Sequence, residues 1–170
     1  MPRPIEHRGT FRYPAEQVYA ALTDEEYLRE RLAEIGGKDA ELLSHDADAD
    51  TVRAVMRQGI GAEDLPGLVQ RFVPQGVVIE RTETWTSATD GGYQGTVEAS
   101  VRGMPASVAG TMTLTNAADG SEMVTTGEVK VEMRLVGGKI ESVIAEQIGQ
   151  LLSEEAEFTN RWLESRNRTA

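Results

Sequence analysis

The chain contains 170 residues, of which 39% are hydrophobic and 5% are aromatic, and it carries a formal net charge of −11 at pH 7. This length fits one domain, residues 1–170, with a core large enough to enclose a cavity. The acidic surface repels phosphate backbones and argues against nucleic-acid partners, while the absence of cysteine excludes disulfides and thiol chemistry.

The chain begins with a predicted strand and two short helices. The stretch IEHRGTFRY alternates weakly between apolar and polar residues and ends before Pro14, which is typical of a strand. PAEQVYAAL then places Pro14 near the first position of a helix, where proline is favoured. TDEEYLRERLAEIGG predicts a second helix that begins at Thr23 or Asp24 and ends at Gly36 and Gly37.

The first residues, MPRPIEHRGTF, contain no apolar stretch of the kind found in secretory leader peptides. No other run approaches the length of apolar sequence that a membrane-spanning helix needs. We therefore expect a cytoplasmic protein without integral membrane contact. Nothing in the composition indicates an oligomeric state.

Residues 39–134 are predicted to form six antiparallel strands. Alternating segments flank three turns rich in Asp and Gly, with the sequences DADAD, SATDGG and NAADG, and such turns join neighbouring strands of a meander. The stretch GIGAEDLPGLVQRFVPQ interrupts the meander and predicts a long loop with one helical turn near Leu68 to Phe72. Because long ordered loops are often lids, we expect Leu65, Leu68 and Phe72 to cover one mouth of a cavity.

The longest helical pattern is LVGGKIESVIAEQIGQLLSEEAEFTNRWL, residues 135–163. Gly137 and Gly138 are expected to let the chain turn sharply from the last strand into this helix. Glu155 falls in the middle of the apolar stripe and is therefore predicted to point into the interior. At about 3.6 residues per turn, that stripe collects the following side chains: Ile140, Ile144, Ile148, Leu151, Leu152, Phe158 and Trp162.

A carboxylate at this position needs a partner, a proton or water, because an unpaired buried charge is costly. We favour a structural pair between Glu155 and an arginine, or backbone N–H groups, over a carboxylate that meets a ligand. A catalytic acid or base is the third alternative. No catalytic residue is assigned.

The strand GVVIERTETW has two possible inner faces. Trp85 and Ile79 favour a face that also carries Arg81 and Glu83, and an inward Arg81 would pair with Glu83 or Glu155. In the opposite register, Arg81 and Glu83 are solvated surface charges. We adopt the inward register as a hypothesis, and the other remains open.

Small residues recur on the inward faces of the last three strands, at Gly95, Ala99, Gly110 and Gly127. Small side chains opposite a long helix leave volume, which favours a largely apolar cavity. Alternatively, the glycines only let the sheet coil tightly. We expect ligand contacts from the strands, the long helix and the loop, at the following positions: Arg81, Trp85, Tyr93, Val97, Met112, Val129, Ile144, Ile148, Leu151, Glu155, Leu68 and Phe72.

No metal or cofactor is predicted. His7 and His45 have no second ligand at metal-binding spacing, and DADAD lacks the glycine and the distal glutamate of a calcium-binding EF-hand loop. The glycine-rich stretch TDGGYQG joins strands and does not open a helix, so it does not indicate a phosphate site.

The order of strand, two helices, six strands and long helix resembles the START/polyketide-cyclase (SRPBCC) superfamily, which has the helix-grip fold also known from the birch-pollen allergen. AEQVYAALTDEEYL is similar to the first helix pair of that superfamily. VKVEMRLVGGKIESVIAEQI is similar to the strand-to-helix junction of a branch of unknown function common in actinobacteria, although Arg134 stands where that branch is expected to have proline.

The resemblance covers nearly the whole chain and implies an α+β fold, with a seven-stranded curved antiparallel sheet wrapped around the C-terminal helix. The superfamily holds lipid carriers, hormone receptors, cyclases and chaperone activators, so it does not define one function. Our leading hypothesis is binding or transport of a hydrophobic small molecule or lipid between sheet and helix. The alternatives are a cyclase/aromatase-like enzyme acting on a polyketide-like substrate and a protein-interaction module; whether any reaction is catalysed stays open.

Overall fold

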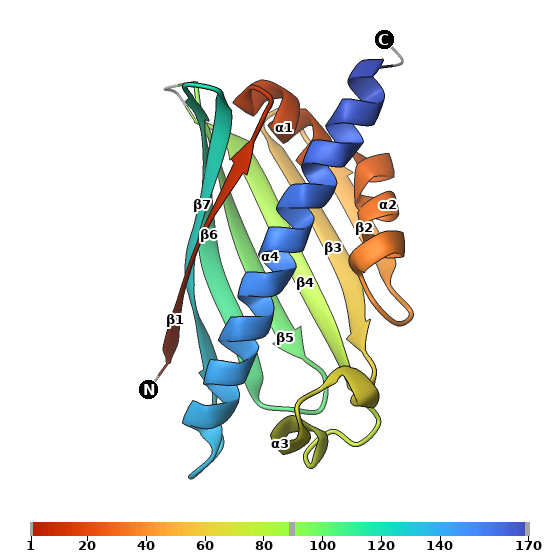
Figure 1. The fold of residues 1–170 in the computed structure, drawn as a ribbon, viewed down its shortest axis with the longest axis vertical. Coiled ribbons are helices and arrows are strands. Elements are labelled where there is room, and N and C mark those ends of the chain that lie inside the picture. Colours follow the sequence, from red (N-terminus) through yellow and green to blue (C-terminus); the bar gives the residue numbers. More distant parts are fainter. Residues whose placement is uncertain (1, 89–90, 169–170) are drawn as a thin grey trace.

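The computed structural model describes residues 2–88 and 91–168 (Figure 1). The predicted turn SATDGG includes residues 89 and 90, which lie outside the described residues. The elements are β1 (Arg3–Phe11), α1 (Ala15–Leu22), α2 (Glu25–Ile35), β2 (Glu41–Ala47), β3 (Thr51–Ile60), η1 (Ala62–Asp64), α3 (Gly67–Gln70), β4 (Val77–Ser87), β5 (Tyr93–Val101), β6 (Ala106–Ala117), β7 (Gly120–Val131) and α4 (Gly137–Arg168). This order confirms the α+β helix-grip fold.

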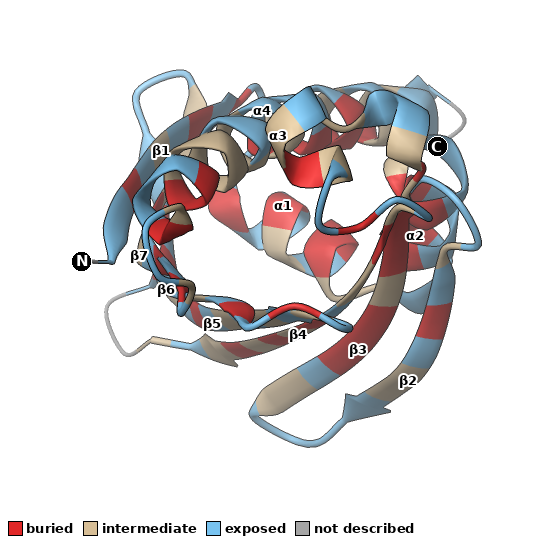
Figure 2. Cartoon of the chain, turned by 90° about the horizontal axis from the view of Figure 1, so that it is seen from below, coloured by how far each residue is buried: buried red, intermediate tan, exposed pale blue. Residues whose placement is uncertain are grey.

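The seven strands form one antiparallel sheet in the order β1-β7-β6-β5-β4-β3-β2. Consecutive strands pair through β2 to β7, as expected for an antiparallel meander. β1 lies beside β7, where Ile5 is opposite Gly127. Figure 2 shows the sheet curving from β1 round to β2, with α4 lying across its open side.

The two short helices follow β1 directly. Asp24 is the N-cap of α2, because its side chain accepts a hydrogen bond from the backbone N–H of Tyr27 at 3.1 Å. Beyond the end of α2, Gly37 has φ of +80°, which glycine adopts without steric cost. The Asp24 cap and the glycine stop are therefore as predicted.

The turn between β7 and α4 differs from the prediction. Leu135, with φ of +70°, makes the left-handed turn, whereas Gly137 and Gly138 already belong to α4. Gly137 is needed for packing, because a Cβ there would lie 2.8 Å from the carbonyl oxygen of Val131. Although α4 has 32 residues, no helix in the described ranges is both long and apolar enough to cross a membrane.

The interior contains two apolar clusters separated by charged residues. One cluster includes Trp85 and Phe158, and the other includes Val77 and Ile140. Arg81 and Glu83 lie between them on β4, and Glu155 lies between them on α4. Desolvated charges therefore occupy the middle of the core, which is where they need partners most.

Two facing glycines allow β6 and β7 to approach closely. Gly110 and Gly127 are opposite each other in the register. A Cβ at Gly127 would lie 2.3 Å from the carbonyl oxygen of Ala109, and one at Gly110 would lie 2.7 Å from that of Thr126. Backbone atoms cannot move aside as a flexible side chain does, so neither position accommodates a side chain without distorting the sheet.

Gly127→Ala is expected to lower the free energy of unfolding by about 1–3 kcal/mol, the usual effect of overpacking. Gly149→Ala is the matched control, since a Cβ at this position in α4 meets no atom within 4 Å. The control should raise stability by about 1 kcal/mol, because alanine is the better helix former. Urea unfolding of both variants measures the difference, and equal effects would contradict the close approach.

Candidate functional site

A buried ion pair joins the sheet to α4. Arg81 donates from Nη1 to Glu155 Oε2 at 2.7 Å and from Nη2 to Glu155 Oε1 at 3.0 Å. This two-point geometry is the strongest arrangement of a guanidinium and a carboxylate. Both residues are buried, at 7% and 6% exposure. β4 therefore takes the inward register of the sequence hypothesis, and Glu155 is a structural partner of Arg81.

A second pair lies beside the first. Arg31 of α2 donates from Nη2 to Glu83 Oε2 at 3.0 Å, and both side chains are buried. The pairs also contact each other: Arg31 Nε lies 3.8 Å from Glu155 Oε2, and Arg81 Nη2 lies 3.5 Å from Glu83 Oε2. We call these four residues the charge cluster. With two cations and two anions, it has no net charge.

The charge cluster shifts the pKa of its members. Burial by itself raises the pKa of Glu155, but Arg31 and Arg81 outweigh burial and hold that pKa below its ordinary value of 4.5. Burial likewise lowers the pKa of Arg31, and Glu155 and Glu83 more than reverse this effect. Glu155 is thus ionised at neutral pH although it lies in the core.

Arg31 was not identified from the sequence. The signal was nevertheless present, because Arg31 lies at helical spacing among Tyr27, Leu28 and Leu32, which form the buried face of α2. A charged residue within an apolar stripe is the same feature that identified Glu155. The two residues point toward each other from different helices.

An apolar chamber of about 120 Å³ lies between the sheet and α4 next to the charge cluster. Its walls include six of the residues expected to contact a ligand: Arg81, Val97, Met112, Ile144, Ile148 and Leu151. Ala99, Gly110 and Gly127 also line the chamber, as expected for small inward residues. Gly95 does not, because Trp85 and Met112 fill the space in front of it.

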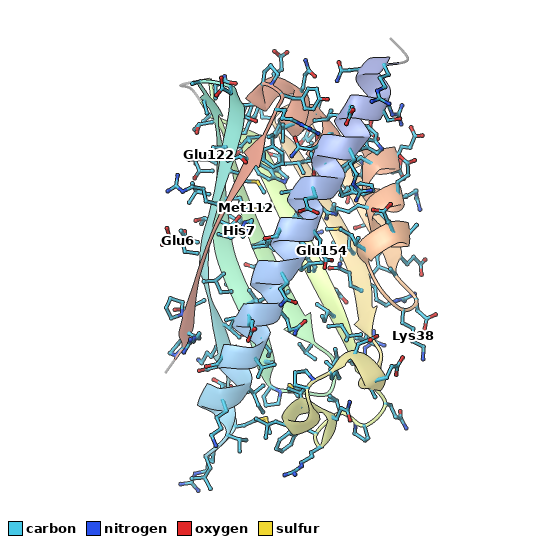
Figure 3. The ribbon with its side chains drawn as sticks, viewed as in Figure 1. Glu6, His7, Lys38, Met112, Glu122 and Glu154 are labelled. Atoms are coloured by element: carbon cyan, nitrogen blue, oxygen red, sulfur yellow. The ribbon has the colours of Figure 1, made fainter. Side chains whose placement is uncertain are left out.

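A larger recess of about 590 Å³ connects the chamber to the surface, and we call it the mouth. It runs between α4 and the segments that follow α2 and β3. Lys38 and Glu154 line it from these two sides (Figure 3). The chamber and the mouth share the following side chains: Gln58, Ile79, Val101, Ile144, Ile148 and Leu151.

The other predicted contact residues lie outside the chamber wall. Trp85 packs edge-on against the Tyr19 ring, with the ring centroids 6.0 Å apart. Tyr93 stacks on the Tyr19 ring, with the centroids 4.0 Å apart. Val129 is fully buried in the apolar cluster that includes Val77 and Ile140. Glu155 is occupied by its hydrogen bonds from Arg81. These four residues therefore do not line the chamber.

The loop between β3 and β4 contributes other residues than expected. Leu65 and Val69 line the mouth, whereas Leu68 does not and Phe72 is 42% exposed. The reason is the short helix α3 of four residues, which turns Val69 inward and leaves Phe72 beyond its end. Of the three residues expected to cover the mouth, only Leu65 is placed there.

His7 is a titratable residue of β1, an edge strand of the sheet, and it lies beside α4. Its Nε2 lies 3.1 Å from Ser153 Oγ on α4. Burial lowers the pKa of His7 below 6.5, although Glu155 acts in the opposite direction. Within the described ranges, no three His, Asp or Glu side chains are grouped so that they would hold a metal ion.

Comparison with known proteins places the chain among uncharacterized relatives. Uncharacterized protein Rv0481c of Mycobacterium tuberculosis is 29% identical over 170 residues, which cover 96% of this chain and 98% of that protein. The structure of an uncharacterized protein from Rhizobium leguminosarum aligns with a TM-score of 0.58 at 14% identity. The alignment covers 97% of this chain and 96% of that one. Human STARD10 aligns with a TM-score of 0.57 at 11% identity, covering 97% of this chain and 66% of that one.

At these identities the solved structures show the fold alone, which is the helix-grip fold. The family comparison extends over most of the sequence, because the family described as "Protein of unknown function (DUF2505)" matches residues 6–163. The chain therefore belongs to the DUF2505 family.

Proposed function

We propose that this protein binds a hydrophobic small molecule or lipid, with the apolar part of the ligand in the chamber and the remainder in the mouth. The observation that carries the proposal is a mostly aliphatic chamber enclosed by the sheet and α4 and open to the surface on one side. Concave apolar sites with few polar groups are the usual form of small-molecule sites.

The energetics favour an apolar occupant. Each methylene group transferred from water into such a site contributes about 0.8 kcal/mol. The chamber wall offers Val97, Ala99 and Met112 from the sheet and Ile144 and Ile148 from α4, all without charge. The helix-grip resemblance supports the same proposal, since that superfamily includes lipid carriers.

The charge cluster supports a binding role, because one of its four residues, Arg81, forms part of the chamber wall. Arg81 reaches the chamber wall, but Glu155 accepts two of its hydrogen bonds. The Arg81 side chain is therefore held in place at the wall, and neither carboxylate of the charge cluster lines the chamber. Rigid walls reduce the entropy lost when a ligand binds.

Ala99→Phe tests the proposal, because it places an aromatic ring in the chamber from the wall of β5. Ser100→Phe is the matched control, since the adjacent residue is exposed on the outer face of the same strand. We expect Ala99→Phe to weaken binding of the neutral dye N-phenylnaphthylamine by at least about 10-fold, and the control to bind as wild type.

Native mass spectrometry of protein purified from its own host provides an independent measurement. A retained apolar molecule in the wild type that is missing from Ala99→Phe would support the proposal. Wild-type protein that neither retains a molecule nor binds the dye would refute it, as would equal dye binding by Ala99→Phe and Ser100→Phe.

A further inference from the structure

Gln58 is a polar residue at the junction between the chamber and the mouth. It lies on β3 opposite Ile79, is only 6% exposed, and lines both spaces. Within residues 2–88 and 91–168, its side-chain carboxamide has no hydrogen-bond partner. A buried amide offers one acceptor and two donors, and leaving them unmade is costly. The hydrogen-bonding groups of the Gln58 side chain are therefore not used by the chain itself.

Other unpartnered atoms near the chamber are less accessible. Arg81 Nε and Thr125 Oγ1 make no hydrogen bond, but both atoms are buried and inaccessible to solvent. Gln58 is not shielded in this way, and a molecule moving from the mouth into the chamber passes it. Among the described residues that line both spaces, Gln58 is the one with a polar side chain.

The charges around this junction disfavour an anionic ligand. At the mouth, Lys38 is accompanied by three carboxylates, Glu63, Asp64 and Glu154. Deeper inside, the cations of the charge cluster are already neutralised by its anions at 2.7–3.0 Å. A ligand carboxylate or phosphate would lose its hydration without gaining a free cation, which is unfavourable.

We infer that the ligand is an uncharged apolar molecule with one hydrogen-bonding group, a hydroxyl or a carbonyl, that binds the Gln58 carboxamide at the junction. This inference rests on the proposed function and specifies the class of ligand. The apolar body enters the chamber, and the amide selects neutral polar ligands over both pure hydrocarbons and anions.

Three probes of the same shape test this inference: naphthalene, β-naphthol and β-naphthoate, each measured by displacement of N-phenylnaphthylamine at pH 7. Wild-type protein should bind β-naphthol about 2- to 10-fold more tightly than naphthalene, the effect of one net hydrogen bond. β-Naphthoate should bind at least about 10-fold more weakly than β-naphthol, because its charge is desolvated without a partner.

Gln58→Leu removes the amide with little change in volume and should reduce the preference for β-naphthol over naphthalene to about one. Gln94→Leu on the exposed outer face of β5 is the control and should keep the wild-type preference. An unchanged preference in Gln58→Leu, or wild-type binding of β-naphthoate as tight as that of β-naphthol, would overturn the inference. If naphthalene binds in either case, the proposed function survives; if neither the dye nor naphthalene binds, the proposed function fails as well.

Discussion

Glu155→Gln is expected to lower the free energy of unfolding by about 3–5 kcal/mol, because it leaves a buried cation without compensation. In the wild type, Glu155 receives two hydrogen bonds from Arg81 and lies near Arg31. A neutral glutamine keeps the shape of the side chain but leaves the charge cluster with one excess positive charge. Urea or thermal unfolding at neutral pH measures the loss.

Glu157→Gln is the control for this experiment, since Glu157 lies two residues further along α4 and is exposed. It should change stability by less than about 0.5 kcal/mol. A loss of less than 1 kcal/mol in Glu155→Gln would contradict an ionised, paired carboxylate.

The pH dependence gives a second measurement on the same residue. The pKa of Glu155 in the folded chain lies below 4.5, because Arg31 and Arg81 outweigh burial. The stabilising contribution is therefore present above the ordinary carboxyl pKa and is lost as pH falls through the lower, folded-state value. The stability difference between wild type and Glu155→Gln should shrink in that acidic window and be constant at neutral pH.

Arg31→Met is expected to destabilise the protein by a similar amount, about 3–5 kcal/mol, because it leaves Glu83 without its 3.0 Å partner. The methionine retains much of the apolar volume of the side chain. Arg29→Met on the exposed side of α2 is the matched control and should cost less than about 1 kcal/mol.

The double variant Arg31→Met/Glu83→Gln tests whether net neutrality is what matters. It restores equal numbers of positive and negative charges, since Arg81 and Glu155 remain paired. We expect it to recover at least half of the stability lost in Arg31→Met. A double variant less stable than the single one would show that individual contacts, and not the balance of charge, stabilise the core.

Much of the architecture could be predicted from local patterns. Alternation and turn chemistry indicated the strands of the sheet, and the apolar stripe of α4 indicated that Glu155 points inward. Trp85 correctly indicated the inner face of β4, because a large aromatic side chain is more readily buried than its polar neighbours. From that face, a pair of Arg81 with Glu83 or Glu155 was predicted, and the structure forms the two-point pair with Glu155.

The remaining features depend on contacts between distant segments. The space before Gly95 is filled by Trp85 and Met112, which come from neighbouring strands. Phe72 follows a helix of only four residues, too short for a periodic pattern to indicate which side chains face the mouth. Likewise, the burial of Gln58 without a hydrogen-bond partner depends on how the sheet and α4 enclose its side chain.

The facing glycines of β6 and β7 also limit which positions of the chamber wall can change its volume. Neither Gly110 nor Gly127 can acquire a side chain without meeting a backbone oxygen within 2.7 Å. That part of the chamber wall therefore cannot be filled by a side chain at either position. A change in the volume of the chamber therefore falls on neighbouring wall positions that already carry a side chain, such as Val97, Ala99 and Val108. Under the proposed function, enlarging or shrinking these side chains changes the size of the ligand that the chamber accepts.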